Sequence, residues 1–178
     1  MRKQDRIANA LIDAGALFDV RLTAGLNRVD LFKGFANEDG TLTHPATPLF
    51  HPRSELPDTT IVLTAQEVLD HALSMAAMRG SREAAQFLLT HGAAINAQPP
   101  GFYWKRGRGC SALHKAANEG EIEMVDFLLE SGADPTIRDL QWDNTPAGWA
   151  RYSNEPEIAD ILEVAERRSA GNNIDGSE

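Results

Sequence analysis

A cysteine and a histidine stand close together in this chain, and thiol-based catalysis needs such a pair. Cys110 borders the expected start of a helix, where a thiol pKa can be lowered, and His114 is the histidine that could lie beside it. The five histidines show no zinc-ligand spacing, and the sequence contains no glycine-rich phosphate loop. We therefore expect no catalytic residue, metal ligand or cofactor. An enzyme that uses Cys110 and His114 is a weaker alternative than the two binding functions given below.

The pattern around this pair recurs along the chain. Residues 111–135 contain two short helical segments followed by a Ser-Gly-Ala-Asp-Pro turn. Similar residues return 40 positions earlier, at 73–93, and 34 positions later, at 145–162. Fainter copies lie at 7–16 and 22–32. A fixed period of this length indicates stacked structural repeats.

Each copy is expected to be a pair of helices. The segment that begins near Glu121 has apolar residues at 124, 125, 128 and 129, which form one stripe along a helix. The helix before it, from Ala112 to Asn118, is short and rich in alanine. Neither helix can bury its apolar face alone, so neighbouring pairs must stack. Asn27 replaces the glycine of the turn in the 22–32 copy, and we expect it to adopt a positive φ angle.

The period, the Ser/Thr-started first helix and the Leu-Leu-x-x-Gly-Ala ending resemble the ankyrin repeat. The segments 99–104 and 145–150 are also similar to those of a bacterial subgroup of ankyrin proteins. The resemblance implies an all-α solenoid of stacked helix-turn-helix units with hairpin-like finger loops. Its expected parts are a partial repeat at 1–17, a degenerate repeat at 18–40, an insertion loop at 41–66, repeats at 67–108, 109–141 and 142–166, and a disordered tail at 167–178.

The resemblance assigns structural roles to five residues. It implies that His114 ties the finger backbone to the start of its helix. Ser111 and Thr145 precede their helices and are expected to cap them. Gly120 supplies the backbone freedom of the turn between helices, and Gly132 suits the end of the second helix.

The resemblance also implies a partner-binding groove, formed by the fingers and the faces of the first helices. The aromatic and basic finger at 98–108 carries residue types that are enriched at binding hot spots. Two alternatives stay open for it: the rings could cover the next repeat, or they could stack on single-stranded nucleic acid. The expected partner-binding residues are Tyr103, Trp104, Arg106, Met78, Arg79, Asn118, Glu119, Trp142, Asp143 and Tyr152.

The charge distribution narrows the class of partner. The net charge is −9; residues 1–110 carry 12 basic and 11 acidic residues, whereas residues 111–178 carry 5 and 15. This acidity disfavours nucleic acid as a partner. We therefore expect a non-catalytic protein-binding module that acts as a monomer. The alternative is a small acidic regulatory inhibitor or immunity-type protein that masks a basic site on its partner. The single cysteine and the lack of a signal or membrane-spanning segment favour the cytoplasm.

Overall fold

The computed structural model describes residues 20–35, 64–99 and 109–172, together with the helical positions Arg6, Ala10 and Asp13. Within these ranges the chain is helical and contains no strand. The half repeat expected at 1–17, most of the 41–66 insertion and the finger residues Tyr103, Trp104 and Arg106 lie outside the described residues. The elements are α2 (Val20–Gly25), the 3-10 helix η1 (Val29–Phe35), α3 (Ala65–Met78), α4 (Arg82–Thr90), α5 (Ala112–Glu119), α6 (Ile122–Glu130), α7 (Pro146–Tyr152) and α8 (Pro156–Asn172).

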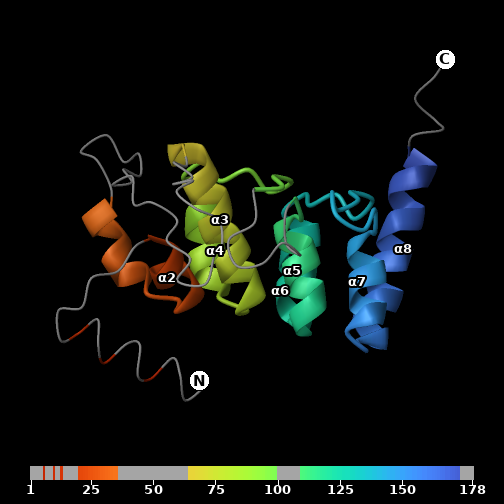
Figure 1. Cartoon of the computed structure of the whole chain (residues 1–178), viewed down its shortest axis with the longest axis horizontal. Helices are drawn as coiled ribbons and strands as arrows, with labels where there is room; N and C mark the ends of the chain where they lie inside the picture. The colour runs from red at the N-terminus through yellow and green to blue at the C-terminus, as the bar shows by residue number, and fades with distance from the viewer. Residues whose placement is uncertain are drawn as a thin grey trace, which may run out of the picture.

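The helices form successive pairs that stack side by side (Figure 1). Each pair has an inner helix and an outer helix: α2 with η1, α3 with α4, α5 with α6, and α7 with α8. The inner helices α2, α3, α5 and α7 form a continuous layer, because each packs against the next. The all-α solenoid expected from the sequence is therefore confirmed.

Small and branched side chains have separate roles in this stack. The alanines of the inner helices, such as Ala76, Ala77, Ala116 and Ala117, have no exposed surface, which permits close approach of neighbouring inner helices. In the outer helix α6 three residues of the expected apolar stripe, Met124, Val125 and Leu128, are at most 1% exposed, and the fourth, Leu129, is partly buried. The acidic residues of α6 take its opposite face, as an amphipathic helix requires.

Each turn between an inner and an outer helix contains one residue in the left-handed region. These residues are Asn27, Gly80, Gly120 and Asn154, with φ angles of 57°, 66°, 77° and 63°. The expectation for Asn27 is thus confirmed. Asparagine tolerates this conformation better than most residues that carry a side chain, so it can replace glycine at both ends of the series.

The residue that follows each turn contacts the turn of the preceding pair. The Ser81 hydroxyl donates to the Gly25 carbonyl oxygen at 3.2 Å. The carboxylate of Glu121 lies against Gly80, and that of Glu155 lies against Gly120. A β-carbon on either glycine would meet these carboxylates, and the ends of the two glutamate side chains would have to shift to admit it.

The two end pairs differ from the middle ones. In the first pair the outer element is the 3-10 helix η1, whose Phe32 is fully buried and stacks on Phe87 of α4 with ring centroids 4.8 Å apart. In the last pair α8 continues to Asn172, which corrects the expectation of a disordered tail from residue 167. Arg167, Arg168 and Ala170 are strong helix formers, and no proline or glycine interrupts the helix before Gly171.

Candidate partner-binding surface

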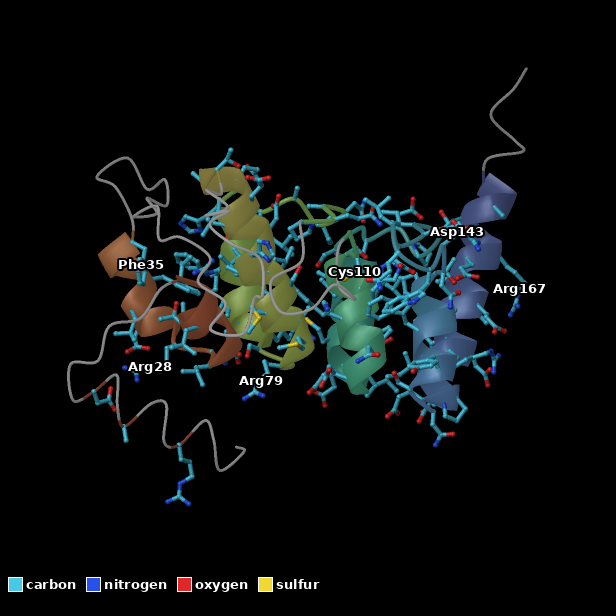
Figure 2. All side chains as sticks on the ribbon, viewed as in Figure 1. Arg28, Phe35, Arg79, Cys110, Asp143 and Arg167 are labelled. Atoms are coloured by element: carbon cyan, nitrogen blue, oxygen red, sulfur yellow. The ribbon has the colours of Figure 1, made fainter. Side chains whose placement is uncertain are left out.

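The loops that join the last three helix pairs are called the first finger (residues 91–111) and the second finger (residues 131–145). Backbone and side-chain hydrogen bonds join them. The Leu140 N–H donates to the Gly109 carbonyl oxygen at 2.9 Å, and the Gln98 side-chain amide donates to the Arg138 carbonyl oxygen at 2.7 Å. Figure 2 shows Cys110 and Asp143 toward the finger end of the stack and Arg79 toward the opposite end, where the turns between helices lie.

His114 joins the start of α5 to the second finger. Its Nδ1 accepts a hydrogen bond from the Ser111 backbone N–H at 3.2 Å and lies 2.8 Å from the Ser111 hydroxyl oxygen. Because Nδ1 accepts, we assign the ring proton to Nε2, which donates to the Asn144 carbonyl oxygen at 3.1 Å. His114 has no exposed surface, and burial lowers its pKa, which favours this neutral form. These contacts support the structural role expected for His114.

Cys110 does not form a catalytic pair with this histidine. Both ring nitrogens of His114 already have partners, at Ser111 and Asn144. The Cys110 side chain is buried, and burial raises the pKa of its thiol. A reactive cysteine needs the opposite shift and an accessible sulfur.

Asp139 organises the second finger. Its Oδ1 accepts the backbone N–H groups of Gln141 and Trp142 at 2.9 and 2.7 Å. Its Oδ2 accepts the Asn144 N–H and the Trp149 indole N–H, both at 3.0 Å. Burial alone would raise the pKa of this carboxyl, but the four N–H donors lower it overall, so Asp139 is ionised at neutral pH.

Thr145 and Gly148 complete the join between the second finger and α7. The Thr145 hydroxyl accepts from the Gly148 N–H at 3.4 Å, which is the capping contact expected of it. Gly148 occupies the position that His114 has in the preceding pair. The Asn144 side chain fills the space beside it, so a side chain at Gly148 would clash.

An aromatic pair lies where the second finger meets α7. Trp149 is 8% exposed, and Trp142 packs edge-on against it with ring centroids 5.5 Å apart. The Lys115 ammonium of α5 lies 5.5 Å from the Trp149 ring centroid, within the range of a cation–π contact. Trp142 is 52% exposed, so the second finger presents to solvent a ring that is supported by its contact with Trp149.

A second group lies at the other end of the inner helices, and we call it the turn-end surface: the exposed Glu119 and Tyr152 and the partly exposed Asn118, Ser153 and Glu155. The Ser153 hydroxyl donates to the Asn118 side-chain oxygen at 2.7 Å, which joins α5 to the end of α7. Tyr152 is 88% exposed, and Glu119 is also exposed. The structure therefore brings three of the expected partner-binding residues together here.

The other expected residues lie on neighbouring elements. Met78 and Arg79 end α3 and are only partly exposed, and the Arg79 side chain packs beside Gly25 of α2. Asp143 is exposed on the second finger and pairs with Arg138 at 2.9 Å. The expected set is thus divided between the finger end and the turn end.

Sequence reasoning missed the contacts made by buried carboxylates. Besides Asp139, the Asp70 side chain of α3 accepts the Ala94 N–H at 2.8 Å and the Gln66 amide at 2.9 Å, both at Oδ1. Asp139 begins a turn, a position where aspartate often binds following N–H groups, so a signal existed for it. Asp70 aligns with Cys110 in the next pair, so the repeat gave no signal for it.

The helices and side chains of the described ranges bear on two further kinds of site, a membrane span and a metal site. None of the helices there has the length and low polarity that a membrane span requires. The same residues contain no cluster of three or more His, Cys, Asp or Glu side chains placed to hold a metal ion.

Comparisons with known proteins agree with this architecture. Residues 58–139 match the family described as "Ankyrin repeats (3 copies)". The chain is 37% identical over 98 residues to human ankyrin repeat and SOCS box protein 6, which covers 55% of this chain and 21% of that protein. It is 34% identical over 113 residues to the mouse B-cell lymphoma 3 protein homolog, covering 64% of this chain and 22% of that protein.

A third relative is closer in size. Human cyclin-dependent kinase inhibitor 2A is 31% identical over 104 residues, which covers 57% of this chain and 62% of the relative. The chain thus spans about a fifth of the length of the first relatives and less than two thirds of this one. These relatives are mammalian, so the resemblance to a bacterial subgroup remains a prediction. From the stacked helix pairs, the joined fingers and these matches we conclude that the chain contains ankyrin repeats, which the family match places at residues 58–139.

Proposed function

We propose that this protein is a non-catalytic module that binds a protein partner through its inner helices and fingers. Ankyrin repeats are in general protein–protein interaction modules. One observation carries the proposal: the three most exposed of the large apolar side chains in the described residues are Leu140 and Trp142 on the second finger and Tyr152 at the end of α7. Exposed rings on a rigid support are typical of interface hot spots, because little conformational entropy is lost when they are covered.

The rigidity of the second finger is what makes Trp142 a suitable anchor. Asp139 fixes the backbone on both sides of the ring, and Trp149 supports one edge of it. Trp149 is itself almost fully buried, so the support for the Trp142 ring is fixed. A partner would therefore meet a Trp142 ring that is already in place, instead of a loop that must first be ordered. This arrangement favours binding over catalysis, since the titratable groups here are used in structural hydrogen bonds.

The experiment compares the proteins that the immobilised wild-type chain and the immobilised Trp142→Ala variant retain from a cell lysate. Proteins retained by each are quantified by mass spectrometry, and the affinity of a protein enriched on the wild type is measured by calorimetry. We expect Trp142→Ala to weaken that affinity by about 2 kcal/mol. Leu22→Ala is the control, because Leu22 is an exposed apolar residue of α2, far along the stack from Trp142. Equal recovery by all three chains would contradict the proposal.

The first finger is a separate part of the proposal. We expect Tyr103→Ala with Trp104→Ala to lower partner affinity by at least about 2 kcal/mol while the melting temperature changes little. Calorimetric melting beside the binding measurement distinguishes the alternatives. A large loss of stability with full binding would mean that these rings pack on the next repeat.

The acidic second half favours one alternative, a regulatory inhibitor that covers a basic site. Residues 111–172 contain 13 acidic and 5 basic residues, and the Arg138 and Arg151 side chains already pair with carboxylates. A relative of similar size is by its name an inhibitor. Under this alternative, retention of the partner falls steeply as salt is raised, because exposed charges are screened. Retention that does not depend on salt would contradict it. The proposal treats the chain as a monomer, which sedimentation at two protein concentrations would test.

A further inference from the structure

The turn-end surface is built around a ring that the fold itself does not use. Tyr152 is 88% exposed at the end of α7. The equivalent position in the preceding pair holds Asn118, which accepts the Ser153 hydroxyl and so joins the two inner helices. Tyr152 stands beside this joint and leaves its ring open to solvent. Covering an exposed tyrosine is a common source of binding energy, because the ring is large and has few rotatable bonds.

Acidic residues lie next to this joint, since Glu119 follows Asn118, the hydrogen-bond partner of Ser153. Glu119 is exposed and ends α5, where the helix dipole adds partial negative charge. The Glu155 carboxylate lies against Gly120, the next residue after Glu119. None of the five residues of the turn-end surface is Lys or Arg, although Arg79 of the preceding pair lies toward the same end of the stack (Figure 2). The neighbouring Arg151 directs its guanidinium toward α8, where it contacts Glu163 at 2.7 Å and Asp160 at 3.2 Å.

Arg151 is thus directed toward α8, and the Glu119 carboxylate accepts a hydrogen bond from the Asn118 side-chain amide at 3.2 Å. An aromatic ring flanked by carboxylates is complementary to a cation, because the ring face and the carboxylates both attract positive charge. A phosphate backbone would be repelled by the same groups, so a nucleic acid does not fit.

We propose that the turn-end surface binds a basic segment of a protein partner, with an arginine or lysine of that segment over the Tyr152 ring and within reach of Glu119 and Glu155. This deepens the proposed function and rests on it. Under this proposal the turn-end surface binds a cationic segment of the partner, whereas the second finger contacts the partner through the apolar ring of Trp142.

The probe for this proposal is a labelled peptide of alternating arginine and glycine. A matched peptide with glutamate in place of arginine serves as the charge control. We expect the basic peptide to bind and the acidic one not to bind. In spectra of the isotope-labelled chain, the Tyr152 ring and the Asn118 side-chain amide should shift on titration with the basic peptide. Tyr152→Ala should weaken binding about tenfold, as for an interface anchor.

The matched variants are Glu119→Gln and Glu130→Gln. Each removes one exposed charge from the last residue of a helix, α5 or α6, so the total charge changes equally. We expect Glu119→Gln to weaken the basic peptide roughly three- to fivefold and Glu130→Gln to leave it unchanged. Equal loss in the two variants, or no loss in Tyr152→Ala, would overturn the proposal, because binding would then follow overall charge alone.

Retention of the natural partner by three variants distinguishes failure of this inference from failure of the proposed function. If Trp142→Ala loses the partner while Tyr152→Ala and Glu119→Gln retain it, the module binds protein but the turn-end surface is not used. If all three variants retain it, both proposals are wrong. Loss in Tyr152→Ala with a folded chain, judged by an unchanged melting temperature, supports this inference.

Discussion

The pairs α3–α4 and α5–α6 fix their fingers in different ways, although their backbones repeat. In α5 the neutral His114 reaches forward and donates to Asn144 of the second finger. In α3 the equivalent residue is Ser74, whose hydroxyl donates within its own helix to the Asp70 carbonyl oxygen at 3.1 Å. The finger is held instead by the Asp70 carboxylate, which accepts the Ala94 N–H. The repeat therefore preserves the attachment of helix to finger, but not the residue that makes it.

Both solutions place an ionisable group in the interior, and burial acts on each in the same sense. It lowers the pKa of His114 and raises the pKa of Asp70, because in both cases the charged form is the one disfavoured. For histidine this favours the neutral form that the hydrogen bonds require. For Asp70 it opposes the ionised form, and hydrogen bonds from Ala94 and Gln66 offset part of the cost.

The largest expected difference between the pairs is in the loss of stability when His114 or its equivalent, Ser74, is replaced by alanine. His114→Ala removes a fully buried ring and leaves the Asn144 carbonyl and the Ser111 N–H without their partner. We expect it to lower the free energy of unfolding by about 3 kcal/mol. Ser74→Ala removes one local hydrogen bond and should cost less than about 1 kcal/mol. Urea unfolding of both variants measures this difference. Similar losses would show that the two positions carry equal weight.

The next comparison is between the carboxylates Asp139 and Asp70. Both hydrogen bonds of Asp70 use Oδ1, which asparagine also possesses, so Asp70→Asn should change stability by less than about 1 kcal/mol. Asp139 uses both oxygens, and in Asp139→Asn the amide group would face the N–H of Asn144 or Trp149. We expect a loss of about 2 kcal/mol. Thermal melting at neutral pH measures both, and a costly Asp70→Asn would mean that its charge is needed.

The sequence predicted the positions at which the backbone repeats, because those depend on local residue types. The positive φ of Asn27 followed from its alignment with Gly120, and the buried stripe of α6 followed from the spacing of its apolar residues. The bond between Asp70 and Ala94 could not be predicted, because it joins residues 24 positions apart and has no counterpart at Cys110. The same holds for the separation of Trp142 from Tyr152, which depends on which end of α7 each one occupies.

The length of the end elements was less accessible to sequence reasoning. Helix α8 continues past the last apolar contact of the repeat, so the period gave no reason to extend it. The 3-10 form of η1 was also not expected, since the 22–32 copy aligns with an ordinary helix. In both cases the length or type of the helix depends on intrinsic helix propensity and on packing against a single neighbouring pair. The repeat pattern does not determine it.

Lowering the pH should affect α5 through His114. Its pKa is lower in the folded chain than in the unfolded chain, where it is about 6.5, so the unfolded chain binds more protons below that pH. Its contribution to stability is therefore complete above about pH 6.5 and is lost as the pH falls toward the folded pKa, at up to about 1.4 kcal/mol per pH unit. Asp139 raises and Lys115 lowers the pKa of His114, each by less than burial does. The slope of unfolding free energy against pH should be smaller in His114→Gln; an unchanged slope would contradict the assignment.

The smallest expected effect compares the turns at the two ends of the stack. The Asn27 side chain donates to Glu83 Oε2 at 2.5 Å and accepts the Ala84 N–H at 3.0 Å, so it caps α4 where Ser81 makes no side-chain cap. The exposed Asn154 has the same backbone conformation but makes no side-chain hydrogen bond to the described residues. Glycine keeps the positive φ at both positions. Asn27→Gly should therefore cost about 1 kcal/mol through the lost cap, while Asn154→Gly should stay within about 0.5 kcal/mol of the wild type. Hydrogen exchange at the Ala84 amide should accelerate in the first variant alone; acceleration in both would mean that the turn conformation, rather than the cap, controls the start of α4.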